Sequence, residues 1–591
     1  MNDTAPTKQV EAGFGSDAIA QLLRELDIPY IALTPGASFR GLHDSLVNFL
    51  GNERPSMLLC IHEENAVALA HGYARVTGKP LAVALHANVG LMHATMAIFN
   101  AWCDRVPILM LGGVGPVDAT KRRPWVDWIH TSRDLGALIR GYSKWDDQPG
   151  SVPAALESIA RALRIANTQP RGPTYVALDA GLQEEVLSVP VPLPPLERFP
   201  PPQDAAPSSE SVRQAVGWLE AARRPLLMIG RVSNDADDFA RRVALAERVG
   251  AIVLTDIKTG ASFPTQLARH PFPPGLYVTG AAAQAIRDAD VIVSLDWIDL
   301  GGSVRQACEG ANPTGKVISC SLDQYVHNGW NMDYQALPAA DLAILAPPDA
   351  CVRAFVEALG PRTSAAPVPW ASRTAPEPAA AASAQDRMPL AEMARVATET
   401  LATFNPSYLR LPLGWPGEHC RFAHPLDYIG FDGGGGIGSG PGMAIGAALA
   451  LRGGDRLPVA VLGDGDYLMG LTALWTGVHY KIPVLIIVAN NESFFNDELH
   501  QERVARMRGR PVENRWIGMR MSEPDLDLAG LARSQGAHGL GPVRTAGALA
   551  AAVNEAATAV RAGAVTVIDA RVAPEYSRAA SGSLLRHLPK R

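Results

Sequence analysis

Two short polar motifs in the C-terminal third of the chain each follow an apolar run. Gly463-Asp464-Gly465 comes after LPVAVL, and Asn490-Asn491 comes after PVLIIVA. Carboxylate and amide oxygens are hard ligands of the kind Mg²⁺ prefers, and Mg²⁺ held by few protein oxygens commonly bridges to phosphate groups. The glycines let the backbone approach a diphosphate closely, and the start of a following helix adds N–H donors. The motifs therefore predict a magnesium and diphosphate site on Asp464 and Asn491.

The chain between these two residues is long enough for one crossover helix and a neighbouring parallel strand. Both polar ends would then meet at the carboxyl edge of a sheet, where open α/β sheets bind ligands. Each motif alone is also typical of an ordinary turn, since Gly-Asp-Gly and Asn-Asn are frequent in loops. Their combination, with a strand pattern before each motif, favours the ligand site.

The elements that must position these motifs alternate between strand and helix. Short apolar runs such as YIAL, PLAVALH and VPILML fit buried strands, and ENAVALAHGYARVTGKP fits a helix stopped by Gly78 and Pro80. Such alternation predicts the α/β class, with mostly parallel sheets flanked by helices. Proline-rich segments divide the chain into domains. The sequence predicts domains at residues 10–189, 208–360 and 390–580, with a linker at 361–389.

Composition excludes several classes of protein. The net charge is −6 and aromatic residues make up 6%, so nucleic acid is not an expected partner. Six cysteines without a CxxC pair indicate neither a zinc site nor a disulfide framework. There is no apolar run long enough to span a membrane and no signal-peptide pattern, so a cytoplasmic protein is expected.

With GDG, about two dozen residues and then NN, the chain resembles the thiamine-diphosphate (ThDP) dependent family of acetohydroxyacid synthase, pyruvate oxidase and benzoylformate decarboxylase. The resemblance covers about residues 10 to 580 and implies the ThDP-binding fold, with pyrimidine-binding, Rossmann-like and diphosphate-binding domains in that order. It implies Asp464 and Asn491 as side-chain Mg²⁺ ligands and Ser493 as a third ligand through its carbonyl. Asp466 departs from the family's Ser or Ala, and a carboxylate beside a diphosphate is unfavourable unless it turns away.

Glu63 lies in the segment HEENAVALAHGYARVTGKP, between an apolar run and a helix. Without further information, Glu63 and Glu64 would only complement the dipole at the helix start. Family members carry a similar H-E-x-x-A…GYAR-x-TGKP segment, whose glutamate contacts N1′ of the aminopyrimidine. The resemblance therefore implies that Glu63 promotes proton removal from C2 of the thiazolium. Glu64 departs from the family's Gln or Ala and is expected to face elsewhere.

The glycine-rich segment DGGGGIGSGPG at residues 432–442 is typical of a flexible turn. The resemblance implies that Ile437 is the large aliphatic residue beneath the cofactor. It also implies that the carbonyl of Gly435 receives the 4′-amino group. Gly463 and Gly465 would line the diphosphate.

Two histidines are candidates for contact with the substrate. His86 ends PLAVALH, where a lone histidine is usually structural, yet LHANVG…NAW resembles the LHSAAG…NAW stretch of benzoylformate decarboxylase, whose histidine lies in the active site. His270 in FPTQLARHPFPPG resembles that enzyme's FP…RHP…G segment. The resemblance implies that both shuttle protons. Ala37 stands at the place of a family serine, with Ser38 beside it, which weakens the case for benzoylformate as the substrate.

The implied function is ThDP- and Mg²⁺-dependent cleavage of a C–C bond by a decarboxylase or lyase, with or without carboligation. The substrate would be a small 2-oxo acid, an aldehyde or an acyloin. An acetolactate synthase-type carboligase, a flavin-dependent 2-oxo acid oxidase and a noncatalytic nucleotide- or ThDP-sensing subunit remain alternatives. FAD is not favoured, because no GxGxxG follows the middle strands, and Glu63, Asp464 and Asn491 argue against a noncatalytic subunit.

The family places the glutamate and the diphosphate site of each active centre on different subunits. A homodimer is therefore the smallest active unit that the resemblance implies, and homotetramers are common in the family.

Overall fold

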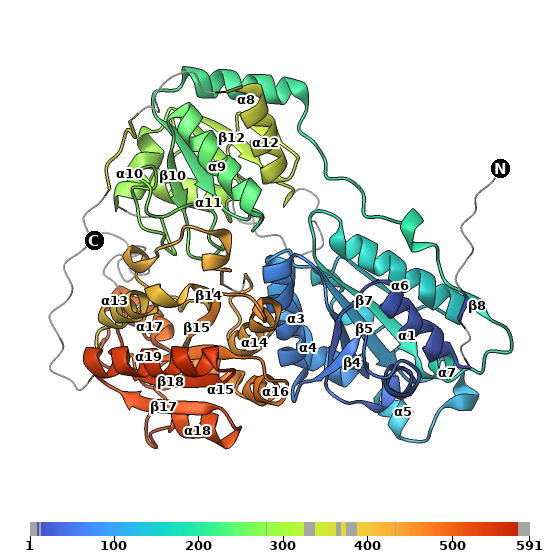
Figure 1. Cartoon of the computed structure of the whole chain (residues 1–591). Coiled ribbons are helices and arrows are strands. Elements are labelled where there is room, and N and C mark those ends of the chain that lie inside the picture. The colour runs from blue at the N-terminus through green and yellow to red at the C-terminus, as the bar shows by residue number, and fades with distance from the viewer. Residues whose placement is uncertain are drawn as a thin grey trace.

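The computed structural model describes residues 9, 10, 13–278, 280–323, 337–361, 368–373, 387–431 and 433–576. Three parallel sheets flanked by helices follow one another along the chain (Figure 1). This arrangement confirms the predicted α/β class. Each large sheet falls within one of the three predicted blocks, while much of the predicted linker 361–389 lies outside the described residues.

The N-terminal sheet has six parallel strands in the order β3-β2-β4-β5-β7-β6. The strands are β2 (Tyr30–Leu33), β3 (Ser56–Leu59), β4 (Ala82–His86), β5 (Ile108–Val114), β6 (Trp145–Asp147) and β7 (Pro173–Asp179). The helices are α1 (Gly15–Glu25), α2 (Arg40–Asp44), α3 (Glu63–Thr77), α4 (Ala87–Cys103), α5 (Val126–Ile129), α6 (Val152–Asn167) and α7 (Ala180–Gln183). A small antiparallel pair, β1 (Gln9–Val10) with β8 (Val191–Pro192), joins the two ends of this domain.

The middle sheet has five parallel strands in the order β10-β9-β11-β12-β13. The strands are β9 (Pro225–Ile229), β10 (Ile252–Thr255), β11 (Val291–Leu295), β12 (Lys316–Cys320) and β13 (Leu342–Ile344). The helices are α8 (Ser209–Ala221), α9 (Ala236–Val249), α10 (Gly280–Asp288), α11 (Leu300–Ala307) and α12 (Pro348–Ala358).

The C-terminal sheet has five parallel strands in the order β14-β15-β16-β18-β17. The strands are β14 (Pro406–Arg410), β15 (Leu457–Gly463), β16 (Val484–Asn490), β17 (His538–Val543) and β18 (Val565–Arg571). The helices are α13 (Leu390–Leu401), α14 (Gly440–Leu451), α15 (Asp464–Met469), α16 (Ala473–His479), α17 (Phe495–Arg508), α18 (Leu528–Ser534) and α19 (Ala546–Arg561).

The strands and the helix named from the sequence form where they were expected. The two apolar runs before the polar motifs are β15 and β16, adjacent parallel strands whose ends pair Gly463 with Ala489. Helix α3 ends at Gly78, which adopts a left-handed φ of 67° that a glycine tolerates without strain. Across the described ranges, every helix is too short or too polar to cross a lipid bilayer.

Helices α3 and α14 hold the N-terminal and C-terminal domains together, and Figure 1 shows them side by side. They approach through small residues. A Cβ atom on Gly72 would lie 2.0 Å from the carbonyl oxygen of Met443, and one on Gly446 would lie 1.8 Å from that of Leu69. The buried side chains of both helices belong to one apolar core that spans the two domains. The backbone contact therefore fixes the position of Glu63, at the start of α3, relative to the C-terminal sheet.

Gly446→Ala should loosen this contact, because overpacking a close backbone approach costs about 1–3 kcal/mol or more. We expect a lower melting temperature in thermal unfolding followed by circular dichroism. Gly217→Ala is the matched control: Gly217 is inside α8 and a Cβ there meets nothing within 4 Å. Alanine at position 217 should be neutral or slightly stabilising. Equal melting temperatures for the two variants would contradict the assigned packing.

Candidate active site

Asp464 and Asn491 line one cavity of about 360 Å³ at the carboxyl edge of the C-terminal sheet. Asp464 begins α15 directly after β15, and Asn491 follows the last residue of β16. Because β15 and β16 are neighbouring parallel strands, their ends bring the two side chains to the same edge. Gly463, Gly465 and Ser493 line the same cavity. The structure thus brings these predicted ligands together.

The Asp464 carboxylate is buried and only partly hydrogen-bonded. Its Oδ1 accepts the N–H of Gly465 at 2.8 Å, whereas Oδ2 has no hydrogen-bond partner among the described residues. Burial raises the pKa of Asp464 to about 7, and hydrogen bonds from nearby backbone groups oppose this rise. A buried carboxylate oxygen without a partner is costly unless a cation satisfies it. The residue therefore has the environment of a metal ligand.

The loop after β16 is held by charged and polar contacts. Glu492 adopts a left-handed φ of 56° and pairs with both Arg571 and Arg387. Asn491 Oδ1 accepts the N–H of Ser493 at 2.9 Å, and the Ser493 hydroxyl donates to Glu498 at 2.5 Å. Ser493 lines the cavity while its hydroxyl is engaged with Glu498.

Asp466 turns toward protein donors. Its carboxylate accepts the N–H groups of Gly438 at 2.7 Å and Gly440 at 3.1 Å, and its Oδ2 lies 2.9 Å from Nε of Arg410. The Arg410 guanidinium stacks on Phe431 at 4.2 Å. The charge expected to disturb a diphosphate is therefore balanced by Arg410. Sequence reasoning missed Arg410, although it ends β14 at the same edge of the sheet.

The glycine-rich segment packs against α4. Added Cβ atoms would lie 2.4 Å from Asn100 at Gly434 and 2.4 Å from Met96 at Gly436. Asn100 Nδ2 also donates to the Gly436 carbonyl at 3.3 Å. The segment forms turns, as its composition indicates, and Gly435 and Ile437 line the cavity. Asp432, at the start of the segment, lies outside the described residues.

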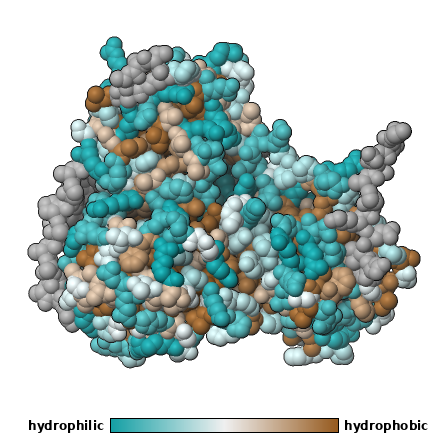
Figure 2. Space-filling model, in the orientation of Figure 1, coloured by the Kyte–Doolittle hydropathy of each residue, from teal (hydrophilic) through white to brown (hydrophobic). Residues whose placement is uncertain are grey.

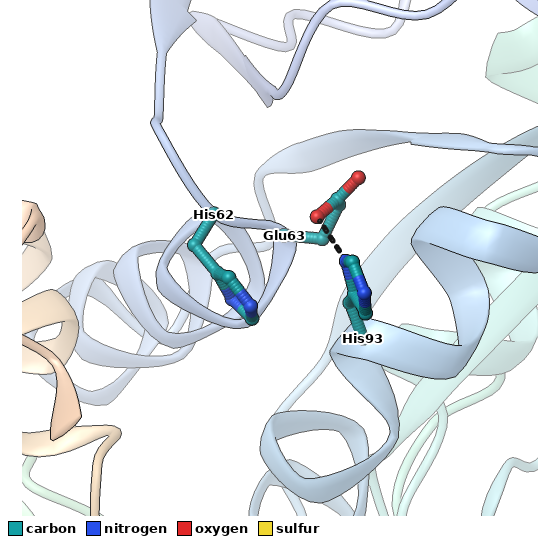
Figure 3. A group of neighbouring side chains, drawn as sticks. All are labelled: His62, Glu63 and His93. Carbon is teal, nitrogen blue, oxygen red and sulfur yellow. Dashed lines mark hydrogen bonds and ion pairs between the residues drawn. The ribbon is translucent and has the colours of Figure 1, made fainter.

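Glu63 does not line the Asp464 cavity of its own chain. It begins α3, is 6% exposed, and lies 3.0 Å from Nδ1 of His93 on α4 (Figure 3). His62 caps the helix by accepting the Glu64 N–H at 3.2 Å. The Ser439 hydroxyl donates to Glu64 at 3.3 Å, so Glu64 contacts the end of the glycine-rich segment. The two predicted halves of the site therefore lie apart within one chain.

His86 ends β4 and is half-buried. Its Nδ1 is 2.8 Å from the hydroxyl of Ser38, and its ring lies 4.6 Å from that of His130. Burial, then the neighbouring His130, lowers the pKa of His86, so the imidazole is neutral and can accept a proton at neutral pH. Ser38 orients this ring. His130 carries no sequence signal, because it comes from a loop distant along the chain.

His270 lies in the middle domain, away from the Asp464 cavity. It is 2% exposed, its Nε2 is 2.8 Å from the Thr255 hydroxyl, and its ring stacks on Phe263. Burial lowers the pKa of His270 to about 4, so it remains neutral near pH 7. The structure does not place His270 in the cavity lined by Asp464.

Both halves of the predicted site lie in segments that match models of known protein families. The family model for the N-terminal TPP binding domain of thiamine pyrophosphate enzymes matches residues 14–135, and the model for the C-terminal TPP binding domain matches residues 413–570. The chain belongs to the thiamine pyrophosphate enzyme family. In this thiamine pyrophosphate enzyme, the first matched segment contains Glu63 and the second contains Asp464 and Asn491.

Relatives match most of this thiamine pyrophosphate enzyme. Benzoylformate decarboxylase of Pseudomonas aeruginosa is 25% identical over 74% of this chain and 79% of its own. The probable 2-ketoarginine decarboxylase of the same species is 26% identical, covering 89% of both chains. The acetolactate synthase large subunit of Parasynechococcus marenigrum is 26% identical over 89% of this chain and 83% of its own.

Solved structures share the fold. Benzoylformate decarboxylase from Polynucleobacter necessarius has a TM-score of 0.77 at 21% identity, covering 96% of this chain and 100% of that one. The 4-hydroxybenzoylformate decarboxylase of Rhodococcus jostii has a TM-score of 0.76 at 22% identity, covering 95% and 100%.

The C-terminal cavity of the thiamine pyrophosphate enzyme fits a cofactor diphosphate with a cation. A Cβ on Gly463 would meet nothing within 4 Å, so space remains beside the strand end. Asp464 supplies an unpartnered carboxylate oxygen, and Asn491 supplies an amide, which together suit a hard cation. Ile437 would support the cofactor from the glycine-rich side.

A second cavity, of about 420 Å³, lies where the middle domain meets the other two, and Figure 2 shows the surface hollowed there. It adjoins the carboxyl ends of β9 and β11, the usual nucleotide edge of such a sheet. Arg105 and Arg231 join Asp296 and Asp323 in one ion-pair network at this edge. The two arginines balance the two carboxylates of this network.

Asp464→Asn should stabilise the cofactor-free protein at alkaline pH. The folded pKa of Asp464, about 7, lies above its ordinary value of 3.8. Protonated Asp464 therefore stabilises the folded state fully below about pH 4, and this stabilisation is lost as the pH rises through 7. The free energy of unfolding changes on the order of 4 kcal/mol between these limits. The variant should melt higher than the native protein at pH 8, with a gap that shrinks toward pH 5. Equal melting temperatures of the variant and the native protein at pH 8 would contradict the raised pKa of Asp464.

The Arg410–Asp466 pair should behave as a coupled unit. Arg410→Met leaves a buried carboxylate without its cation and should cost about 3–5 kcal/mol. Adding Asp466→Ser to that variant should recover part of the loss in melting temperature. A double variant no more stable than Arg410→Met would show that the pair is not coupled.

Proposed function

We propose that this protein is a Mg²⁺-dependent ThDP enzyme that cleaves the C–C bond beside the carbonyl of a small 2-oxo acid. The buried, unpartnered oxygen of Asp464 beside Asn491 is the observation that carries the proposal. Asp464, Asn491 and the Ser493 carbonyl would hold Mg²⁺ and the diphosphate. When bound, the cofactor supplies a thiazolium carbon that adds to the substrate carbonyl and holds the electron pair released by cleavage.

The remaining steps fall to this chain's own side chains. Glu63 holds a proton at N1′ of the pyrimidine, and its burial favours that exchange by keeping water away. His86, oriented by Ser38, moves a proton to and from the substrate. The decarboxylases among the relatives support a 2-oxo acid substrate, and the acetolactate synthases support carboligation as the second candidate.

The active unit would be a homodimer or a dimer of such dimers. Glu63 lies outside the Asp464 cavity of its own chain, so a second chain must complete each centre. Large apolar side chains are exposed near both halves. They are Ile61, Met92, Trp125 and Trp128 on the N-terminal domain, and Met469, Trp516 and Ile517 on the C-terminal domain. Their burial between subunits would stabilise the pairing.

FAD is not favoured, because no GxGxxG motif follows the strands of the middle domain. We therefore propose a non-flavin enzyme, and a colourless purified protein is expected. A cytoplasmic location is part of the proposal, supported by six cysteines that form no disulfides.

Glu63→Gln should lower turnover about a hundredfold or more while leaving ThDP bound. The assay measures CO₂ release and product identity by NMR with benzoylformate, 4-hydroxybenzoylformate, pyruvate and 2-ketoarginine. Glu64→Gln, one residue along and turned toward Ser439, is the matched control and should retain activity. If the Glu63 variant stays within about twofold of native turnover on every accepted substrate, the proposed role of Glu63 is wrong.

Complementation tests the shared site directly. Asp464→Asn and Glu63→Gln should each be inactive alone, but a mixed dimer contains one centre with both native residues. Co-expressed chains that pair at random should therefore regain about a quarter of native activity. No recovery in dimers shown to be mixed would mean that each centre lies within a single chain.

A further inference from the structure

Among the described residues, His93 is the one side chain that hydrogen-bonds to the Glu63 carboxyl group. Nδ1 of His93 lies 3.0 Å from Oε2 of Glu63, as the dashed line in Figure 3 marks. The two side chains differ sharply in exposure: that of Glu63 is 8% exposed and that of His93 is 52% exposed. The imidazole therefore joins a buried carboxyl group to solvent.

Helix α4 places a glycine and a histidine against the Glu63 carboxyl group. Gly90 and His93 are three residues apart and share one face of the helix. A Cβ on Gly90 would lie 3.1 Å from Oε1 of Glu63, so glycine leaves room for the carboxyl group. His93 then meets the other oxygen. One oxygen of Glu63 is engaged by His93 while the other remains available to a bound pyrimidine.

The surrounding imidazoles do not compete for Glu63. His62 stacks on His93 with ring centres 5.0 Å apart and planes 19° from parallel. Because Nδ1 of His62 accepts the Glu64 N–H, its hydrogen is on Nε2. His86 is engaged by Ser38. Burial lowers the pKa of both His62 and His86, so these neighbours are neutral near pH 7.

The same three groups, His62, Glu63 and His93, offer ligand atoms within 4.8 Å of one another, as a metal site would. Binding a cation through Nε2 of His62 would require that ring to move its hydrogen to Nδ1 and give up its bond to the Glu64 N–H. The contacts of the trio suit proton transfer better than metal binding.

We propose that His93 is the positioning and proton-exchange residue that connects Glu63 to solvent during cofactor activation. The inference rests on the proposed role of Glu63. A hydronium ion or a buffer acid gives a proton to Nε2 of His93 and is left as water or its conjugate base, and the proton on Nδ1 passes to Oε2 of Glu63. The ring is left neutral with its hydrogen on Nε2. The reverse sequence returns the proton to water, so each cycle balances.

Exchange of the C2 proton of bound ThDP for deuterium, without substrate, reads out this step. Native protein, His93→Asn and Glu63→Gln, each with Mg²⁺ and ThDP, are mixed into D₂O, quenched in acid and measured by NMR. Asparagine keeps a hydrogen-bonding group near Glu63 but cannot relay a proton. His538→Asn is the control, because it makes the same substitution at a histidine on β17 whose side chain is 42% exposed and pairs with Glu555, away from Glu63.

His93→Asn should slow the exchange by about tenfold or more at low buffer concentration, and added imidazole should restore it. Native protein and His538→Asn should exchange rapidly whatever the buffer concentration. ThDP affinity, measured by tryptophan fluorescence, should stay within about threefold of native in His93→Asn, which a merely structural role would not predict.

Exchange in His93→Asn within about twofold of native at low buffer overturns the inference, as does slow exchange that imidazole does not relieve. Glu63→Gln separates this failure from failure of the proposed function. If Glu63→Gln is slow and His93→Asn is fast, only the relay is wrong. If Glu63→Gln exchanges like native protein, the role of Glu63 itself fails.

Discussion

The contact between α3 and α14 is the constraint on which both halves of the site depend. Glycines at the crossing let the two backbones meet, and no larger residue could stand there without moving a helix. Because α3 begins at Glu63 and α14 follows the glycine-rich segment, this single crossing sets where each half faces. Within one chain, the crossing leaves Glu63 outside the cavity lined by Asp464.

Two carboxylates at the diphosphate cavity and its loop are balanced by arginines before any ligand arrives. Arg410 balances Asp466, and Arg571 with Arg387 balances Glu492. Asp464, in contrast, keeps a buried oxygen without a hydrogen-bond partner in the described structure. The cavity thus presents a carboxylate oxygen at the position where a cation is needed.

Local pattern was enough to predict the strands, the α/β class and the meeting of Asp464 with Asn491, since strand ends and ligand chemistry are both visible in sequence. The resemblance added Glu63 and Ile437. Arg410, Ser38 and His130 could not be found this way, because each acts through a contact made only after distant segments pack. The role of His270 stays a prediction, since packing buries it in the middle domain, outside the cavity lined by Asp464.

The unsatisfied oxygen of Asp464 also affects how long the protein survives. This oxygen destabilises the protein when no ligand is bound, and a bound cation would satisfy it. Ligand binding then stabilises the folded state, and the free energy of unfolding grows with the logarithm of the ratio of free ligand concentration to dissociation constant. Chains made when thiamine is scarce would spend more time partly open and within reach of proteases. Vitamin supply would then govern the abundance of this enzyme as well as its rate.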